Sequence, residues 1–156
     1  FIARLKTKTA HIYFTTLNYG SVLPVFPNHD KTKGIANAES FLPPHLLLIT
    51  GIANPVPLRE YISSVGQLAG EMVFPDHHRY RHNDILAIQN RLNSIKSDQK
   101  LIVVTEKDAV RLRELSIPDD IKTALHFIPI DVGFLFNEGP AFKQHIYRYI
   151  KGSEPR

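Results

Sequence analysis

The run Asp76-His77-His78 is the clearest candidate for chemistry in this sequence. It follows Pro75 at the end of a stretch typical of a strand, where an acid beside two histidines has few packing roles. Imidazole titrates near neutrality, and a neighbouring carboxylate can orient the ring or raise its pKa. These properties suit a proton shuttle, with a purely structural role as the alternative. We therefore predict that Asp76 and His77 are catalytic and that His78 contributes less.

A metal site is a second interpretation of the same run. Asp and His are good ligands for zinc or manganese, so a metal-dependent phosphoesterase could be built around these three residues. Such a site needs further ligands, for which the sequence offers Asp108, His82 and His126. Because no paired spacing marks these residues as ligands, we predict no metal site in this chain.

Two other segments, 51–55 and 105–108, also lie between a predicted strand and the helix after it. Functional groups of open α/β sheets gather at such positions, and helix N-termini suit a phosphate. Helix capping is the structural alternative, since Asn54 and Thr105 can each accept a hydrogen bond from a free helix amide. Capping does not account for Lys107. We expect Asn54 and Lys107 to contact an anionic ligand such as a phosphate, because one shared anionic ligand would explain all these segments.

Several familiar signatures are absent from the sequence. It contains no Gly-x-x-x-x-Gly-Lys-Ser/Thr loop and no Gly-x-Gly-x-x-Gly, so this chain alone cannot cradle a nucleoside triphosphate in either familiar way. No Gly-x-Ser-x-Gly nucleophile elbow occurs either. Because the chain has no cysteine, disulfides, thiolate metal sites and thiol nucleophiles are excluded.

The composition is that of one domain, or one domain and a small appendage. The chain has 156 residues, of which 43% are hydrophobic, enough for a core. Lys and Arg exceed Asp and Glu by 19 to 15, and the net charge of +4 favours anionic partners without choosing among them. No apolar run approaches the roughly 18 residues of a membrane span. The sequence begins at Phe1 without a signal-peptide pattern, and we expect it to be a piece of a longer protein.

Alternating strand and helix patterns begin near residue 45. Apolar runs predict strands at 46–50, 71–74 and 101–104, and one or two more within 125–136. Helical spacing of apolar residues predicts helices after Pro55, from about 84 to 95 behind Asn83 as cap, after Thr105, and over 142–150 behind Asn137 as cap. This order predicts an α/β fold with a mostly parallel sheet and helices on both faces.

The first part of the chain has a different pattern. Two β-rich stretches, 10–16 and 22–26, flank a segment whose Asn18 and Gly20 tolerate positive φ, which predicts a hairpin. Residues 27–44 then turn polar and aperiodic, as in a connector. We therefore predict that residues 1–44 form a β-hairpin hinge or linker and that residues 45–156 form the α/β domain.

Three motifs, in this order, resemble the C-terminal domain of the tetraacyldisaccharide 4′-kinase family, the lipid A 4′-kinases of Gram-negative bacteria. They are TGIANP at 50–55, FPDHHRY at 74–80 and VTEKDAVRL at 104–112. Residues 13–27 are similar to the segment that joins the two domains of that family, so the resemblance covers nearly the whole chain. The details of these segments look most like members from the Bacteroidetes.

The resemblance implies a reaction. An N-terminal P-loop domain, outside this chain, would bind ATP and Mg²⁺ and supply a catalytic aspartate. His77 would pair with that aspartate, and Asp76 precedes His77 as in the family. This pair would assist removal of the proton from the 4′-hydroxyl of tetraacyldisaccharide 1-phosphate. The implied partners are that lipid, the protein's own N-terminal domain and the cytoplasmic face of the inner membrane, and no nucleic acid. The chain alone is expected to be inactive.

Two functions of other classes stay open at this stage. One is the metal-dependent phosphoesterase, which stoichiometric manganese or zinc in the purified chain would favour. The other is a non-catalytic module that binds a phosphorylated ligand. A P-loop upstream in the full gene product would exclude both.

Overall fold

A computed structural model describes residues 11–29 and 45–152. The chain divides into two compact units, one made of Tyr19–Ile130 and the other of Phe1–Asn18 together with Asp131–Arg156. We call the first the sheet unit and the second the ribbon unit. None of the described helices combines the length and the hydropathy that crossing a membrane requires.

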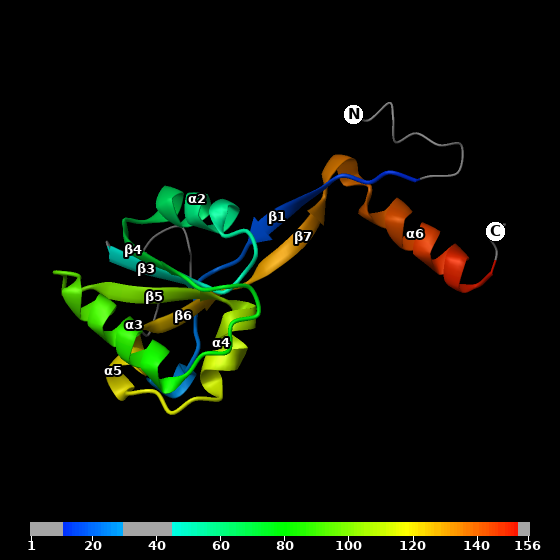
Figure 1. Ribbon diagram of the computed structural model, residues 1–156. Coiled ribbons are helices and arrows are strands. Elements are labelled where there is room, and N and C mark those ends of the chain that lie inside the picture. The colour runs from blue at the N-terminus through cyan, green and yellow to red at the C-terminus, as the bar shows by residue number, and fades with distance from the viewer. Residues whose placement is uncertain (1–10, 30–44, 153–156) are drawn as a thin grey trace. The chain divides into compact units, whose positions relative to one another are not determined.

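A five-stranded sheet forms the centre of the sheet unit (Figure 1). Its strands are β2 (Leu23–Pro24), β3 (His45–Thr50), β4 (Leu68–Val73), β5 (Lys100–Thr105) and β6 (Leu125–Ile128), in the order β2-β6-β5-β3-β4. The strands β4, β3, β5 and β6 run parallel, and β2 adds an antiparallel edge to β6. Parallel strands end at one edge of a sheet, and that edge carries the loops discussed below.

Helices cover both faces of this sheet. They are α2 (Val56–Val65), α3 (His82–Ser94), α4 (Glu106–Arg113) and α5 (Asp119–Ala124), with a short 3₁₀ turn η1 at Pro27–His29. Figure 1 shows α2 on one face and α3, α4 and α5 on the other. Side chains alternate along β3, so that Leu46 and Leu48 cluster with Leu58 of α2, whereas Leu47 and Ile49 join the core of the opposite face. The predicted α/β class and mostly parallel sheet are confirmed.

The ribbon unit contains a two-stranded sheet and one helix. Its elements are β1 (Thr15–Tyr19), β7 (Ile130–Phe134), the 3₁₀ turn η2 (Leu135–Asn137) and α6 (Gly139–Ile150), with Tyr19 and Ile130 at the boundary belonging to the sheet unit. The ring of Phe142 packs with Tyr13 and Phe134 at centroid distances of 5.2 and 4.8 Å. The Tyr13 hydroxyl lies 3.3 Å from Nδ1 of His145.

The predicted hairpin is wrong. The strand β1 pairs with β7, and β2 pairs with β6. The physical reason is burial: Val22 and Val25 are 8% and 1% exposed in the core of the sheet unit, where the edge of β6 offers backbone partners. A hydrogen bond of 3.0 Å from the amide of Val25 to the carbonyl of Leu125 continues that pairing. Residues 22–26 thus belong to the sheet unit and not to a separate hairpin of residues 1–44, although residues 1–10 and 30–44 lie outside the described part.

The two ends of the sheet unit lie side by side. The amide of Gly20 donates a hydrogen bond of 2.9 Å to the carbonyl of Pro129. The ring of Tyr19 stacks on Tyr61 at a centroid distance of 4.3 Å, which attaches the start of this unit to α2. The chain therefore enters and leaves the sheet unit at one place.

Two predicted helix caps also differ from the structure. The helix α3 begins at His82, so Asn83 lies inside it, and the amide of Arg81 donates to Asp84 at 2.7 Å. Asn137 precedes α6 with a left-handed φ of 56°, and the residue before that helix is Glu138. In the first case the Asp84 carboxylate accepts from the amide of Arg81, and α3 starts directly after Arg81, one residue before Asn83. In the second case the left-handed backbone of Asn137 takes it out of the capping position.

Candidate active site

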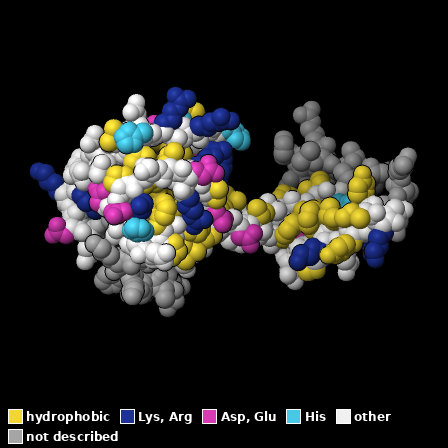
Figure 2. Space-filling view, turned by 90° about the horizontal axis from the view of Figure 1, so that it is seen from below, with side chains coloured by type: hydrophobic (Ala, Val, Ile, Leu, Met, Phe, Trp, Pro, Cys, Tyr) yellow, Lys and Arg dark blue, Asp and Glu magenta, His cyan; other side chains and the backbone are white. Residues whose placement is uncertain are grey.

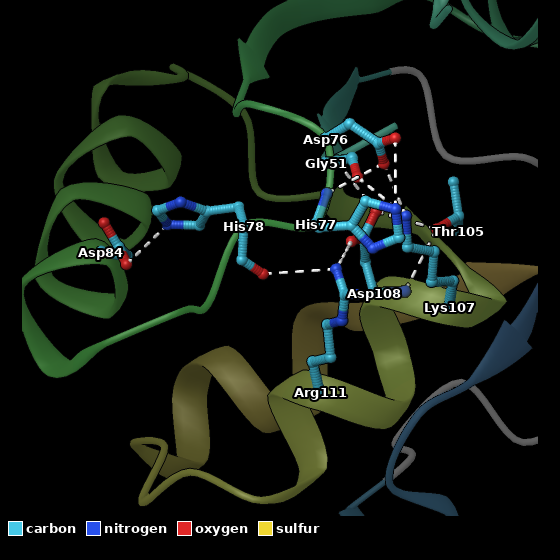
Figure 3. A network of polar contacts seen from close by, with 9 residues as sticks. All are labelled: Gly51, Asp76, His77, His78, Asp84, Thr105, Lys107, Asp108 and Arg111. Atoms are coloured by element: carbon cyan, nitrogen blue, oxygen red, sulfur yellow. Dashed lines mark hydrogen bonds and ion pairs between the residues drawn. The ribbon is translucent and has the colours of Figure 1, made fainter. Parts of the chain in front are cut away.

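Three loops meet where β3, β4 and β5 end, and they carry the motifs singled out in the sequence. Figure 3 shows Gly51 after β3, Asp76, His77 and His78 after β4, and Thr105, Lys107 and Asp108 at the start of α4. The parallel pairing of these strands brings the three loops to one edge of the sheet. The expectation that they lie together is therefore met within the sheet unit.

An ion pair joins the second loop to the third. Nζ of Lys107 lies 2.7 Å from Oδ1 of Asp76 and 3.4 Å from the carbonyl oxygen of Gly51. The hydrogen bond from Lys107 is the main cause that lowers the pKa of Asp76, so the carboxyl stays ionised. Lys107 thus fixes the Asp76 carboxylate and contacts the β3 loop at the same time.

His77 presents its ring to solvent beside that carboxylate. Its side chain is 77% exposed, and its Nε2 lies 3.5 Å from Oδ2 of Asp76. The backbone of His77 has a left-handed φ of 60°, and its amide donates to Oδ1 of Asp76 at 2.9 Å. Such a conformation is uncommon for a residue other than glycine. Asp76 therefore holds both the backbone and the ring of His77, and leaves the ring accessible to an incoming group.

His78 has a different environment from its neighbour. Its Nε2 lies 3.0 Å from Oδ2 of Asp84 at the start of α3, and its ring stacks on Phe74 at 4.5 Å. The carbonyl oxygen of His78 accepts a hydrogen bond from Arg111 at 3.3 Å. These contacts connect the β4 loop to α3 and α4, which is a structural role.

Asp108 is a buried carboxylate that links the first loop to the third. It is 0% exposed, and its Oδ2 accepts hydrogen bonds from the amide of Gly51 at 3.0 Å and from the Thr105 hydroxyl at 2.8 Å. Oγ1 of Thr105 in turn accepts from the amide of Asp108 at 3.1 Å, as the capping prediction expected. Guanidinium nitrogen Nη1 of Arg111 lies 4.0 Å from Oδ1. The sequence suggested only the cap, because its spacing signal is local whereas the bond to Gly51 is not.

Tyr80 completes the buried side of this site, and no role was predicted for it from its place in the sequence. It is 6% exposed, and burial, followed by the negative charge of Asp108, raises its pKa, so the phenol stays neutral. A Cβ atom on Gly51 would lie 3.0 Å from Oδ1 of Asp108 and 3.4 Å from the Tyr80 hydroxyl. A side chain at position 51 would therefore press on the Asp108 carboxylate, which would have to move.

The predicted binding residue Asn54 lies in the turn before α2. Its Oδ1 accepts a hydrogen bond from the amide of Val56, the first residue of α2, at 3.2 Å. This local bond is the helix-capping role that was the structural alternative for Asn54. Lys107, by contrast, is part of the polar network described above.

The possible further ligands for a metal do not join the Asp76 run. Asp108 is engaged with backbone and hydroxyl donors, and His126 is buried in β6 with Nδ1 3.0 Å from the carbonyl of Ala124. Within residues 11–29 and 45–152, no group of three or more His, Cys, Asp or Glu side chains is placed to hold a metal ion. The described residues therefore do not by themselves fit a magnesium site.

The chain is thus an α/β protein whose strand-end loops carry an exposed histidine, an ion-paired aspartate and a lysine. These side chains make the loops a candidate site for proton and phosphate chemistry. Comparison with known proteins specifies the family. The family model described as "LpxK: Tetraacyldisaccharide-1-P 4'-kinase" matches residues 6–151. The chain belongs to this family, as the sequence motifs predicted.

Curated relatives agree with this assignment. The chain is 34% identical over 145 residues to the tetraacyldisaccharide 4′-kinase of Bacteroides thetaiotaomicron, covering 90% of this chain and 38% of that protein. It is 36% identical over 143 residues to that of Parabacteroides distasonis, covering 89% and 37%. The chain spans less than two fifths of the length of these relatives. A crystal structure of LpxK from Aquifex aeolicus, in complex with ATP, aligns with a TM-score of 0.46 at 15% identity, covering 86% of this chain and 35% of that one.

Proposed function

We propose that this chain is the part of a lipid A 4′-kinase that supplies His77 to the reaction. The complete protein would transfer the γ-phosphate of ATP to the 4′-hydroxyl of tetraacyldisaccharide 1-phosphate. The relatives are named tetraacyldisaccharide 4′-kinases, and membership of the same family supports the proposal here. The observation that carries the proposal is the exposed His77 ring beside the Asp76 carboxylate.

In this reaction the bond between the 4′-oxygen and the γ-phosphorus forms, the bond to the ADP oxygen breaks, and the hydroxyl proton leaves. His77 would accept that proton, or pass it to an aspartate of the other domain. Asp76 orients the imidazole through its contact with Nε2 and holds the loop through the His77 amide. Phosphoryl transfer depends on positioning and charge more than on covalent help, which suits such a role.

Lys107 would stabilise negative charge near the phosphates. Its ammonium group has three donors, of which one contacts Asp76 at 2.7 Å and one approaches the Gly51 carbonyl at 3.4 Å. The side chain is 37% exposed, so a donor remains within reach of a ligand. Asn54 would contact the nucleotide less directly, because its side-chain oxygen accepts a bond from its own turn.

ATP and Mg²⁺ would be held mainly by an N-terminal P-loop domain outside this chain. The described residues gather no ligand set for Mg²⁺, so the residues that hold it would belong to that other domain. The whole protein would work at the cytoplasmic face of the inner membrane, where its lipid substrate lies, and would have no nucleic-acid partner. The chain of 156 residues, which spans less than two fifths of the length of these relatives, would be inactive alone.

The test uses the longer gene product that contains this chain, with ATP and tetraacyldisaccharide 1-phosphate. His77→Ala is expected to lower kcat by roughly 10²–10⁴, the usual worth of a positioned proton-transfer group, while KM for ATP changes only a few-fold. The matched control is His82→Ala, an exposed histidine at the start of α3 that should retain kcat. Equal kcat in both variants would contradict the role of His77, and absence of the 4′-phosphorylated product from the unaltered protein would contradict the reaction.

A further inference from the structure

Two exposed arginines follow His77 closely in the β4 loop. They are Arg79 and Arg81, and the chain between them and His77 is so short that their Cα atoms lie no further than about 7 and 14 Å from it. Residues 77–83 contain these two arginines, three histidines and no acidic residue. This stretch therefore presents positive charge beside the candidate proton acceptor without an acid of its own.

The nearest acids in the sequence do not neutralise this charge. The carboxylate of Asp76 is bonded to Lys107 at 2.7 Å. That of Asp84 lies 3.0 Å from the ring of His78 and accepts from the backbone amide of Arg81 at 2.7 Å. In the described part of the chain, no acidic side chain forms an ion pair with the guanidinium group of either arginine.

Basic side chains are common on the sheet unit, and Figure 2 shows Lys, Arg and His side chains close together along one rim of the face in view. Exposure alone therefore does not mark a site. What sets Arg79 and Arg81 apart is the absence of a partner acid. By contrast, Arg59 pairs with Glu71 at 2.8 Å, and Arg111 donates to a backbone carbonyl at 3.3 Å.

The side chain between the two arginines anchors them. Tyr80 is 6% exposed, and its ring packs on Phe74 and His78 at centroid distances of 5.2 and 5.1 Å. The order exposed, buried, exposed over 79–81 is typical of extended chain, in which residues two apart point to the same side. With Tyr80 turned inward, Arg79 and Arg81 therefore point outward together.

Such a pair suits a phosphate. Two Cα atoms about 7 Å apart allow both guanidinium groups to reach one phosphate, to which arginine often donates two parallel hydrogen bonds. The buried Tyr80 and the bond from the Arg81 amide to Asp84 hold the backbone in place before a ligand arrives. Preorganisation of this kind lowers the entropy cost of binding.

The position of the pair favours the acceptor lipid over the nucleotide. In Figure 3, Lys107 and Asp84 lie on opposite sides of His77, and Arg81 directly precedes the helix that carries Asp84. The attacking and leaving oxygens of a phosphoryl transfer lie roughly in line, on opposite sides of the phosphorus. With Lys107 directed to the phosphates of the donor, the side of α3 receives the acceptor.

The family is described by an acceptor that already carries a phosphate, at carbon 1 of a disaccharide whose 4′-position reacts. These two carbons belong to different sugars, so this phosphate lies beyond the reacting ring. We propose that Arg79 and Arg81 bind the 1-phosphate of the lipid and thereby select the phosphorylated acceptor. This inference rests on the proposed function. A phosphate ester is the recognised group, which anionic bilayer lipids also carry, and the experiment separates the two sources.

The experiment compares two lipids, tetraacyldisaccharide 1-phosphate and the same tetraacyldisaccharide without its phosphate, in micelles of a neutral detergent. The longer gene product is prepared unaltered and as the double variant Arg79→Gln and Arg81→Gln. Arg91→Gln is the matched control, because Arg91 is exposed, has no ion pair in the described part of the chain and lies about 15 Å further along α3.

Three quantities are measured for each protein: kcat/KM for both lipids, KM for ATP, and equilibrium binding of each radiolabelled lipid without ATP. The assays are repeated on vesicles of phosphatidylethanolamine and phosphatidylglycerol. The unaltered protein and Arg91→Gln are expected to prefer the phosphorylated lipid by about ten-fold or more in kcat/KM and in binding. The double variant should lose this preference to within about two-fold, with KM for ATP and kcat/KM for the phosphate-free lipid changed by no more than about two-fold.

Several results would overturn the proposal. They are an unchanged preference in the double variant, an equal loss with both lipids, a KM for ATP that rises instead, which would assign the arginines to the nucleotide, and a loss that appears only on vesicles, which would assign them to the bilayer surface. Loss of the preference in lipid binding, in a product that forms no 4′-phosphate, would support this site and contradict the proposed function.

Discussion

The carboxylate of Asp108 accepts a hydrogen bond from the amide of Gly51 at 3.0 Å, although the two residues lie 57 positions apart in the sequence. Lys107, the neighbour of Asp108 in α4, approaches the carbonyl of the same glycine at 3.4 Å and holds Asp76 at 2.7 Å. Both polar groups of the Gly51 backbone are therefore bonded to the start of α4. The position of Asp76, and through it that of His77, depends on this arrangement.

Removal of the Asp108 carboxylate should destabilise the chain. Asp108→Ala leaves the amide of Gly51 and the hydroxyl of Thr105 buried without an acceptor, and we expect the free energy of unfolding to fall by about 2–4 kcal/mol. Urea denaturation followed by circular dichroism measures this change. Asp98→Ala, at an exposed position, is the control and should stay within about 0.5 kcal/mol. Equal stability of the two variants would show that Asp108 does not hold the loops together.

An added methyl group at position 51 should also be costly. In Gly51→Ala the Cβ would lie 3.0 Å from Oδ1 of Asp108, closer than ordinary contacts, so the carboxylate or the β3 loop must move. We expect a loss of about 1–3 kcal/mol in the same unfolding measurement. Gly20→Ala is the comparison, because its Cβ would meet Pro129 at an ordinary 3.4 Å. A Gly51→Ala variant as stable as Gly20→Ala would contradict the tight packing described around Asp108.

Two pairs of lysine and aspartate within residues 45–152 allow a crossed test of electrostatics. Hydrogen bonds from Lys107 and from Lys122 are the main causes that lower the pKa of Asp76 and of Asp119, respectively. Lys107→Gln should raise the pKa of Asp76 towards its ordinary value without affecting Asp119, and Lys122→Gln should do the reverse. Carboxyl ¹³C shifts recorded against pH follow both residues at once.

The sign of the related pH dependence follows from the lowered pKa of Asp76. A carboxyl with a lower pKa in the folded state adds stability above the pKa of the unfolded chain, near 3.9, and loses it as pH falls through the folded value. The difference in stability between the unaltered chain and Lys107→Gln should therefore be present at neutral pH and shrink in acid. A difference that grows below about pH 4 would contradict the ion pair.

Replacing the two adjacent histidines one at a time should affect the thermal stability of the chain differently. His77→Ala removes an exposed ring and should shift the melting temperature of this chain little. His78→Ala removes the contact with Asp84 and the stack on Phe74, so we expect a loss of about 1–2 kcal/mol and a lower melting temperature. Calorimetry of the two variants measures both melting temperatures. A larger loss in His77→Ala would make that residue structural and would contradict its assignment to the reaction.

The sequence predicted those features that have a strong local signal. The apolar runs at 46–50 and 101–104 are the central strands β3 and β5, because a strand buried on both faces needs continuous apolar residues. The strand β4 begins earlier than predicted, at Leu68, since Ala69 and Gly70 weaken its apolar pattern. The Thr105 cap was likewise predictable from spacing alone.

Features that depend on distant partners were missed. Nothing in residues 18–21 shows that β1 pairs with β7 rather than with the next β-rich stretch, because pairing is decided by which edge of a sheet is open. The bond between Asp108 and Gly51 and the neighbouring phenol of Tyr80 are likewise invisible to spacing rules. The sequence could therefore nominate Asp76, His77 and Lys107 as candidates, but not the buried contacts that support them. Their roles in catalysis and binding stay predictions.

The hydrogen bond between Gly20 and Pro129 brings the two ends of the sheet unit next to each other. Since the first and last segments of the sheet unit lie beside each other, the unit leaves a host chain and returns to it at a single point. Domains with adjacent ends can be inserted into a loop of another protein, or circularly permuted, without stretching either structure. Tyr19–Ile130 therefore has the adjacent ends that suit a unit for insertion or circular permutation.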